Sequence, residues 1–345
     1  MPHIRPKSRL GFVLRIARGA LPLMLLALAA CENAKPRSAT PSPRVGTSRP
    51  ASPELPLVSP LALPRADEAA FNRVWRAGLA ELNHYALTQA RYGELHGGDA
   101  VLIFVTEDFL PGAQVKSERP RPPADVVPIL KLNLHKTFTT GLYPYSMMSS
   151  VFSPLAPPNA LSLPAALKVT TSSQEWCGHT FLQLNRLASG RVRARGYSYF
   201  EAEGDQDREL EGALLEDELW TRIRIAPHTL PVGKFSLIPG TMTSRLRHRV
   251  IEPRDAHAAL RRADPATVRY ELRYPSEHRA LAIDFRDAPP FELVGWTETY
   301  PDGFGANPRM LTTTARRTHV LRDAYWTHNR LGDRALREKL GLRAE

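Results

Sequence analysis

Short runs of β-branched, aromatic and aliphatic residues alternate with tight turns along most of this chain, and this pattern restricts its fold more than any other feature. By residue number, the runs lie at 85–92, 100–106, 126–134, 166–171, 177–184, 191–200, 234–238, 243–251, 267–274, 279–285, 291–299 and 310–320. Most are separated by short segments containing Gly, Pro, Asp or Asn, which is typical of strands joined by hairpins. Because few helical segments intervene, the pattern excludes a βαβ fold and favours a sandwich, clam or open barrel. We therefore predict a mainly β protein with a few helices, built on a curved antiparallel sheet.

Three segments predict helices. The first opens the domain with an apolar stripe at helical spacing. This stripe consists of Phe71, Val74, Trp75, Leu79 and Leu82. The other two helices are expected over residues 210–225 and 333–340. Gly97-Gly98-Asp99 has the chemistry of a hairpin turn and is expected to join the first two strands.

The start of the chain predicts a membrane address. Five basic residues precede an apolar run that ends in Leu28-Ala29-Ala30-Cys31, an arrangement that resembles a bacterial lipobox. The run is too short to span a bilayer, which requires about 20 apolar residues. We predict that residues 1–30 are a lipoprotein signal peptide and that Cys31 is lipidated; an ordinary cleaved leader is the alternative. Since Glu32 is not the aspartate that commonly retains lipoproteins at the inner membrane, we expect the bacterial cell envelope, at the outer membrane and facing the periplasm.

Composition divides the remainder into two parts. Residues 31–64 hold the lipidated cysteine and a tether with eight prolines, and residues 65–345 are expected to form a single mainly β domain. Removing residues 1–30 lowers the formal charge from +11 to +6, because that segment has five basic and no acidic residues. This modest charge does not indicate a nucleic-acid partner, so the expected partner is the membrane, contacted through the lipid anchor.

The densest group of reactive side chains lies between residues 170 and 179. On a single strand, Glu175, Cys177 and His179 would share one face because strand side chains alternate. The imidazole could then activate the thiol and the carboxylate could orient the imidazole, which are the catalytic roles of a cysteine enzyme. The alternative is that Cys177 is a packing residue, as free cysteines commonly are.

The same segment carries candidate ligand-binding residues. A buried core strand would rarely hold so many polar side chains, since each one left without a partner costs about 1–3 kcal/mol. We therefore expect the segment to border a pocket or to join a dense hydrogen-bond network. The candidate residues are Thr171, Ser172, Ser173, Gln174 and Trp176, with Tyr143 and Tyr145 as walls.

Cofactor and metal signatures do not occur in the sequence. There is no Cys-x-x-Cys, His-Glu-x-x-His, phosphate-binding or dinucleotide-binding glycine motif, so no metal and no cofactor are predicted. The acidic run over residues 201–211 lacks the order of a calcium loop and is interpreted as a solvated loop. Two arginine sets at alternating positions either line the solvent side of two antiparallel strands or form a basic platform for acidic headgroups. These sets are Arg191, Arg193, Arg195 and Arg245, Arg247, Arg249.

Four segments resemble those of a family of uncharacterised bacterial lipoproteins, some of which carry the label "septum formation inhibitor Maf". They cover residues 87–94, 143–148, 168–179 and 214–220, and Gln174-Glu175-Trp176-Cys177-Gly178-His179 is the most specific of the motifs. The Ser-x-Arg-Arg motif of Maf nucleotide pyrophosphatases has no counterpart here, because the nearest segment reads Ser42-Pro43-Arg44-Val45. The resemblance therefore implies an envelope lipoprotein and no particular activity.

Two functions follow from these observations. The first is a non-catalytic binding or structural role for an anchored lipoprotein whose curved sheet cradles a lipid, a lipopolysaccharide or a glycan. The alternative is a cysteine-dependent envelope enzyme, either a hydrolase or a transferase, that uses Cys177 and His179.

Overall fold

The computed structural model describes residues 61–157, 160–304 and 308–343. The predictions for the signal peptide, Cys31 and the tether up to residue 60 lie outside the described residues. The main strands are β1 (Ala80–Arg91), β2 (Glu94–Leu110), β3 (Val115–Lys116), β4 (Val127–Thr140), β5 (Tyr143–Pro154), β6 (Lys168–Glu175), β7 (Gly178–Arg186), β8 (Val192–Ser198), β9 (Gln206–Leu210), β10 (Leu214–Leu215), β11 (Gly233–Ile238), β12 (Arg254–Asp264), β13 (Thr267–Tyr274), β14 (Arg279–Arg286), β15 (Leu293–Asp302) and β16 (Arg309–Asp323). The α-helices are α1 (Glu68–Trp75), α2 (Leu219–Ile225), α3 (Thr241–Leu246) and α4 (Ala335–Lys339). The short 3-10 helices are η1 (Pro123–Asp125), η2 (Glu216–Glu218), η3 (Pro227–Thr229), η4 (Pro275–Glu277), η5 (Tyr325–Thr327) and η6 (Leu331–Arg334).

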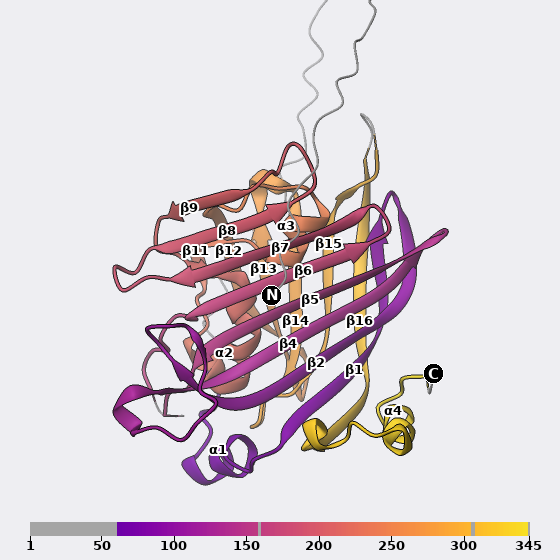
Figure 1. The fold of residues 1–345 in the computed structure, drawn as a ribbon. Coiled ribbons are helices and arrows are strands. Elements are labelled where there is room, and N and C mark those ends of the chain that lie inside the picture. Colours follow the sequence, from indigo (N-terminus) through magenta and orange to yellow (C-terminus); the bar gives the residue numbers. More distant parts are fainter. Residues whose placement is uncertain (1–60, 158–159, 305–307, 344–345) are drawn as a thin grey trace, which may run out of the picture. The chain divides into compact units, whose positions relative to one another are not determined.

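All these strands belong to one sheet of 16 strands that is not closed (Figure 1). Its order is β10-β11-β12-β13-β14-β15-β16-β1-β2-β4-β5-β6-β7-β8-β9, with β3 paired to β2 alone. Each pairing is antiparallel except the short parallel contact between β10 and β11. The predicted fold class, a mainly β chain with a curved antiparallel sheet and a few helices, is therefore confirmed.

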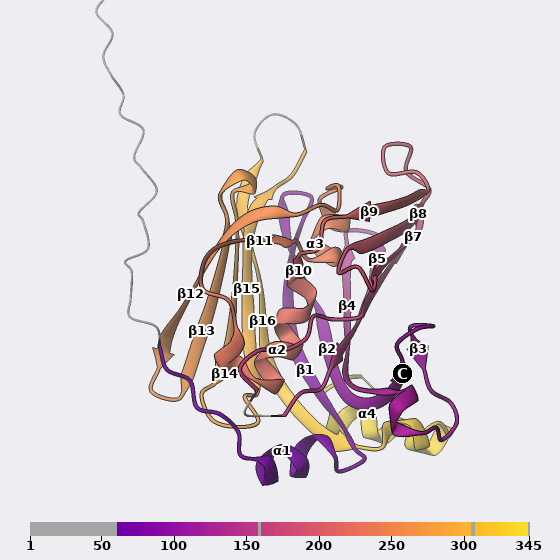
Figure 2. The same cartoon turned by 90° about the vertical axis from the view of Figure 1, so that its left-hand side faces the viewer.

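Two short helices lie between the halves of the curved sheet. Figure 2 shows α2 and α3 with β12 to β15 on one side and β4 to β9 on the other. Every residue of α2 is buried, including Arg222 and Arg224. A buried charge is tolerated only when it is paired, and Arg224 donates to both carboxylate oxygens of Glu81 on β1, at 2.5 and 2.9 Å. This ion pair joins the helix to the centre of the sheet.

The 3-10 helix η2 supplies three buried carboxylates that connect separate parts of the fold. Glu216 accepts hydrogen bonds from Arg279 and from the hydroxyl of Tyr274. Asp217 accepts from the backbone N–H and the hydroxyl of Thr241, at 3.1 and 2.8 Å. Glu218 accepts from the backbone N–H of residue 166 at 2.7 Å. The acidic side chains thus attach α3, the segment before β6, and the strands β13 and β14 to one short turn of helix.

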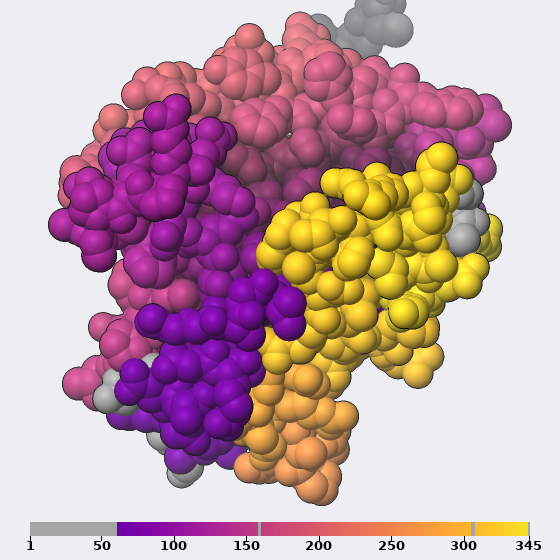
Figure 3. All heavy atoms as spheres, turned by 60° about the horizontal axis from the view of Figure 1, so that its bottom comes forward, coloured from indigo at the N-terminus to yellow at the C-terminus, as the bar shows by residue number. Residues whose placement is uncertain are grey.

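A second, smaller apolar cluster lies apart from the main core. Its buried members are Ala80, Leu82, Val101, Val105 and Leu340. Four of these lie on β1 and β2, and Leu340 comes from the C-terminal segment, which contains η5, η6 and α4. In Figure 3 the C-terminal residues, in yellow, lie against the violet and magenta strands. The C-terminal segment therefore covers part of the face of the sheet that the main core does not use.

Two local predictions are wrong. Residues 243–251 do not form a strand, because 241–246 are the helix α3, in which Met242 and Leu246 are buried at helical spacing. The first hairpin turn lies at Tyr92-Gly93, whose φ values of 58° and 80° suit the two central residues of a type I′ turn. Gly98 instead lies inside β2, where a Cβ would overlap the carbonyl oxygen of Thr137 on β4.

The ends of two predicted helices also differ from those in the structure. The opening helix ends at Trp75, and Leu82 belongs to β1 instead. Only Leu219–Ile225 of the long internal helix is α-helical, because the residues before it form β10 and η2. The strands β5, β9 and β12 were not predicted, because they are rich in Ser, Met, Arg or Asp and therefore have weak strand propensity.

Candidate functional site

The strand register brings several turns to one end of the sheet, here called the hairpin end. These turns are the connections at residues 92–93, 141–142, 176–177, 199–205, 275–278 and the one after Asp302. The segment that follows α3, residues 247–250, lies against two of them, because Arg247 contacts Glu277 and His248 contacts Glu203. The hairpin end therefore gathers residues from distant parts of the chain.

The predicted catalytic group lies at the tip of one of these hairpins. β6 ends at Glu175, Trp176 and Cys177 form the turn, and β7 begins at Gly178. The strand that was expected to carry Glu175, Cys177 and His179 on one face is therefore interrupted. His179 pairs with Gln174, so alternation places its side chain on the opposite face from Glu175. The turn thus separates the three residues of the predicted triad.

The partners of Cys177 do not favour a thiolate. The backbone N–H of Cys177 donates to Glu175 Oε2 at 2.6 Å, and the hydroxyl of Tyr199 donates to Oε1 at 3.0 Å. The thiol is exposed, and its hydrogen bond to the Glu175 carboxylate raises its pKa above the ordinary 9.0. A catalytic cysteine requires the opposite shift. This turn therefore lacks the activation that the enzyme hypothesis needs.

The predicted ligand-binding residues divide between the two faces of the sheet. Thr171 and Ser173 are buried, whereas Ser172 and Gln174 alternate with them and Trp176 is exposed at the tip. The Thr171 hydroxyl lies 3.0 Å from the hydroxyl of Ser149 and 2.6 Å from that of Thr241. Thr171 therefore joins a hydrogen-bond network, and it also borders a pocket described below.

The predicted walls, Tyr143 and Tyr145, belong to a cluster of phenols that the sequence did not reveal. Tyr92 from the first hairpin turn receives a hydrogen bond from Tyr143 at 3.1 Å and lies 2.6 Å from the hydroxyl of Tyr145. The ring of Trp176 lies 6.4 Å from that of Tyr143. Burial alone would raise the pKa of Tyr92, but the two phenols and the Arg91 charge lower it below 10.0. In the sequence, the only sign of a special role for Tyr92 is that it lies in segment 87–94, one of the four that carry the family resemblance.

Arg91 is the central cation of this cluster. Its side chain is buried, with 7% exposed, and it donates to the carbonyl oxygen of Leu246 and to the hydroxyls of Tyr92 and Tyr145. Its Nε has no hydrogen-bond partner among residues 61–157, 160–304 and 308–343. Within the described part of the chain, no carboxylate lies within ion-pair distance of Arg91. All its partners in the described residues are neutral oxygens, so no anion among these residues balances its charge.

Arg91 lines a pocket of about 450 Å³ at the hairpin end, here called the arginine pocket. The other ionisable residues of its wall are Arg247, His248, Arg249, His278, Glu277 and Asp302. Arg247 is already paired with Glu277 at 2.7 Å. Arg249 is exposed and has no ion pair among the described residues. Beside them, the ring of Phe304 is stacked on that of Tyr92, with centroids 5.1 Å apart.

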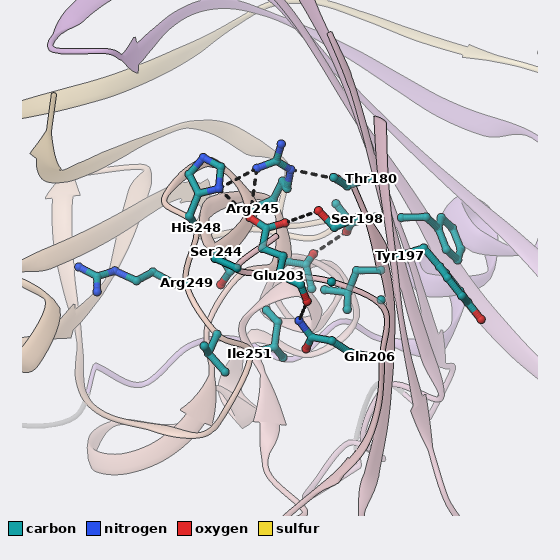
Figure 4. Close-up of a pocket in the computed structure, with 18 residues that line it drawn as sticks. Thr180, Tyr197, Ser198, Glu203, Gln206, Ser244, Arg245, His248, Arg249 and Ile251 are labelled. Carbon is teal, nitrogen blue, oxygen red and sulfur yellow. Dashed lines mark hydrogen bonds and ion pairs between the residues drawn. The ribbon is translucent and has the colours of Figure 1, made fainter. Parts of the chain in front are cut away.

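A second pocket, of about 110 Å³, shares His248 and Arg249 with the arginine pocket. In Figure 4, Glu203 points toward His248 and Arg245, and Arg245 reaches Thr180. Nδ1 of His248 lies 2.6 Å from Glu203 Oε1. No hydroxyl or thiol of the described residues contacts the other ring nitrogen, so the pair lacks a nucleophile. The contact between His248 and Glu203 therefore has a structural role, because it holds in place a residue that lines both pockets.

The two arginine sets do not form one basic platform. Arg193 on β8 donates to Asp207 on β9 at 2.6 and 2.7 Å, and Arg191 contacts Glu209 and Glu211. The acidic run therefore neutralises the first set. The second set lies on α3 and the turn after it, because the predicted strand over 243–251 is wrong.

Three further results concern metal ions, membrane-spanning helices and similar proteins. Over residues 61–157, 160–304 and 308–343, no group of three His, Cys, Asp or Glu side chains is arranged to hold a metal ion. In the same residues, no helix is long and apolar enough to cross a membrane. Comparisons with protein-family models, curated proteins and solved structures found no match to this chain.

Proposed function

We propose that this protein is an envelope-anchored lipoprotein that binds an anionic glycan or glycolipid headgroup at the hairpin end, without catalysing a reaction. The observation that carries the proposal is Arg91, a residue that is 7% exposed, lines a pocket and has only neutral partners among the described residues. A buried charge without a counter-ion destabilises a protein, and an anion that enters the pocket would remove this cost.

The pocket wall supports an anionic ligand in two further ways. Arg249 lies on the surface of both pockets and has no ion pair in the described residues, so it is free to donate to a phosphate or carboxylate. Charge-assisted hydrogen bonds from a guanidinium are about twice as strong as those between neutral groups, and they are often bidentate. Arg91 and Arg249 together therefore favour a ligand group with several anionic oxygens.

The aromatic side chains support a glycan next to the anion. Phe304 is 81% exposed and stacked on Tyr92, at the edge of the arginine pocket. Trp176, 66% exposed, lies against Tyr143 in the neighbouring hairpin. Such rings offer a flat apolar face with a polar edge, which suits the C–H face of a sugar. A phosphorylated sugar matches the charge and the aromatic surface together.

The cysteine-dependent enzyme remains the second candidate because Cys177 is exposed. The raised pKa of its thiol and the opposite orientation of His179 favour the binding role. The chemical labelling described in the Discussion distinguishes the two.

The binding proposal is tested with the full-length lipoprotein in detergent, by calorimetric titration of glucose 1-phosphate against glucose and inorganic phosphate. We expect glucose 1-phosphate to bind most tightly. Arg249→Gln should weaken it roughly tenfold, about the 1.4 kcal/mol of a single charge-assisted bond. Arg91→Gln should abolish binding, and Arg316→Gln, on an exposed residue of β16, should have no effect.

Equal affinity for glucose and glucose 1-phosphate, or unchanged binding by Arg249→Gln, would overturn the proposal. Lipidation of Cys31 is tested by metabolic labelling of bacteria that produce the protein with an alkyne fatty acid. The Cys31→Ser substitution should prevent this labelling. An unlabelled wild-type protein would contradict the lipoprotein assignment.

A further inference from the structure

We propose that a separate apolar pocket beneath the C-terminal segment binds the acyl chain of a single-chain carboxylate, such as a long-chain fatty acid. The pocket has a volume of about 500 Å³ and is here called the acyl pocket. Its floor is formed by strands of the second apolar cluster and its roof by η5, η6 and α4. Its apolar lining includes Leu82, Val101, Ile103, Leu321, Leu340 and Leu342.

The size and lining of the acyl pocket indicate an apolar ligand. Protein interiors are packed at the density of organic crystals, so an open apolar volume of this size is not an ordinary packing defect. It falls in the range of about 300–1,000 Å³ that is typical of ligand pockets. Water gains little in such a space, because it needs polar partners that aliphatic side chains do not provide. A flexible hydrocarbon chain is the ligand that the lining matches.

The rim of the acyl pocket indicates a carboxylate at one end of that chain. Arg337 lies on the rim and is exposed, and its Nε donates to the carbonyl oxygen of Arg343 at 2.9 Å. In the part of the chain that the structure describes, no carboxylate pairs with Arg337. The rim carboxylates Asp323 and Asp333 contact His328 instead, at 3.1 and 3.8 Å.

The other rim histidine does not compete for the anion. His135 lies 3.2 Å from the hydroxyl of Ser146, and burial lowers its pKa below 6.5. It is therefore neutral near pH 7. Arg337 is left as the rim cation that is available to an incoming carboxylate, and this complementarity selects a fatty acid over a neutral lipid.

The test uses the full-length protein and titrates decanoate, dodecanoate, tetradecanoate and tetradecanol by calorimetry. Affinity should rise roughly fourfold for each added methylene, as expected for burial of a hydrocarbon chain. Arg337→Gln should weaken tetradecanoate about tenfold and leave tetradecanol unchanged. Lys339→Gln, on the same helix and outside the pocket lining, is the matched control and should bind like the wild type.

Two variants fill the space without removing the rim. Ile103→Trp on β2 and Leu342→Trp on the roof should each abolish binding of both ligands, and far-UV circular dichroism checks that each variant folds. Binding that survives both substitutions, or that does not depend on chain length, would overturn the proposal. A concentration-dependent dimer that dodecanoate fails to dissociate would show that a second copy covers the pocket instead. The result is independent of glucose 1-phosphate binding, which uses other residues.

Discussion

The carboxylate of Glu175 lies beside the Cys177 thiol in a two-residue turn, and it raises the pKa of that thiol above 9.0. We therefore expect the thiol to react slowly with iodoacetamide at pH 7, and its rate to keep rising beyond pH 9. Glu175→Gln removes the negative charge and leaves one neutral acceptor oxygen, so the pKa of the thiol should fall and labelling at pH 8 should become several-fold faster. Mass spectrometry of the folded protein at a series of pH values measures this rate.

His179→Gln is the informative control for this prediction. If His179 acted as a base for Cys177, its removal would slow the labelling, whereas the structure places it on the opposite face from Glu175. We expect no change. A slower His179→Gln protein, together with an unchanged Glu175→Gln protein, would restore the cysteine enzyme as the better interpretation.

Single residues at the hairpin end were only partly predictable. The polar density of residues 170–179 led to the expectation of a pocket border or a hydrogen-bond network, and Thr171 contributes to one of each. The predicted alternation of side chains between the two faces of one strand does not continue beyond Glu175, because the chain reverses direction at Trp176 and Cys177. Arg91 could not be found in this way. Its significance arises from Tyr145 and Leu246, which are distant in sequence and supply only neutral oxygens.

Among the elements, η2 gives the sharpest dependence on pH. Burial and the nearby Glu216 charge raise the pKa of Asp217 from 3.8 to about 7, against the hydrogen bonds from Thr241. The folded protein then holds a proton that the unfolded chain releases above about pH 4. This contribution to stability is complete below pH 4 and is lost as pH rises through 7.

We therefore expect the free energy of unfolding to fall between pH 4 and pH 7 by up to about 1.4 kcal/mol per pH unit. Urea unfolding of Asp217→Asn, compared with the wild type, isolates this term from the histidines that titrate in the same range. The variant should show a flatter dependence. Asp205→Asn, in an exposed loop, is the control and should follow the wild type. A parallel pH dependence for wild type and Asp217→Asn would show that Asp217 is already ionised.

Elements with strong local patterns were predicted well, and the others were decided by their surroundings. The run at 267–274 coincides with β13 because aromatic and β-branched residues alternate with polar ones there. By contrast, α3 has only six residues and reads as a strand in isolation. Its helical form depends on burial of Met242 and Leu246 against the sheet, which no local pattern reveals.

At the scale of the whole molecule, the first and last long strands pair near the middle of the sheet. β1 and β16 are antiparallel neighbours, although they lie more than two hundred residues apart in sequence. Hairpin chemistry predicts which consecutive strands pair, so the antiparallel class was accessible from the sequence. The pairing of β1 with β16 was not, because no turn joins these two strands and their register brings together residues from the two ends of the domain.

The ion pair between Glu81 and Arg224 connects this central region to α2, and its two side chains are 2% and 0% exposed. Burial alone would raise the pKa of Glu81, but Arg224 lowers it to about 2, so the carboxylate is ionised at pH 7. Glu81→Gln would leave the Arg224 charge buried without a counter-ion. We expect the free energy of unfolding, measured with urea at pH 7, to fall by about 3–5 kcal/mol.

A pair with nearly the same geometry but different burial provides the control for this last prediction. Arg193 and Asp207 meet at 2.6 Å on β8 and β9, with side chains 38% and 49% exposed. Water screens exposed pairs and solvates either partner when the other is removed. Asp207→Asn should therefore leave stability nearly unchanged. Equal losses for Asp207→Asn and Glu81→Gln would show that proximity of the charges, and not burial of Arg224, determines the cost. A large loss for Glu81→Gln alone, partly recovered when Arg224→Met is added, would identify the unpaired charge as its cause.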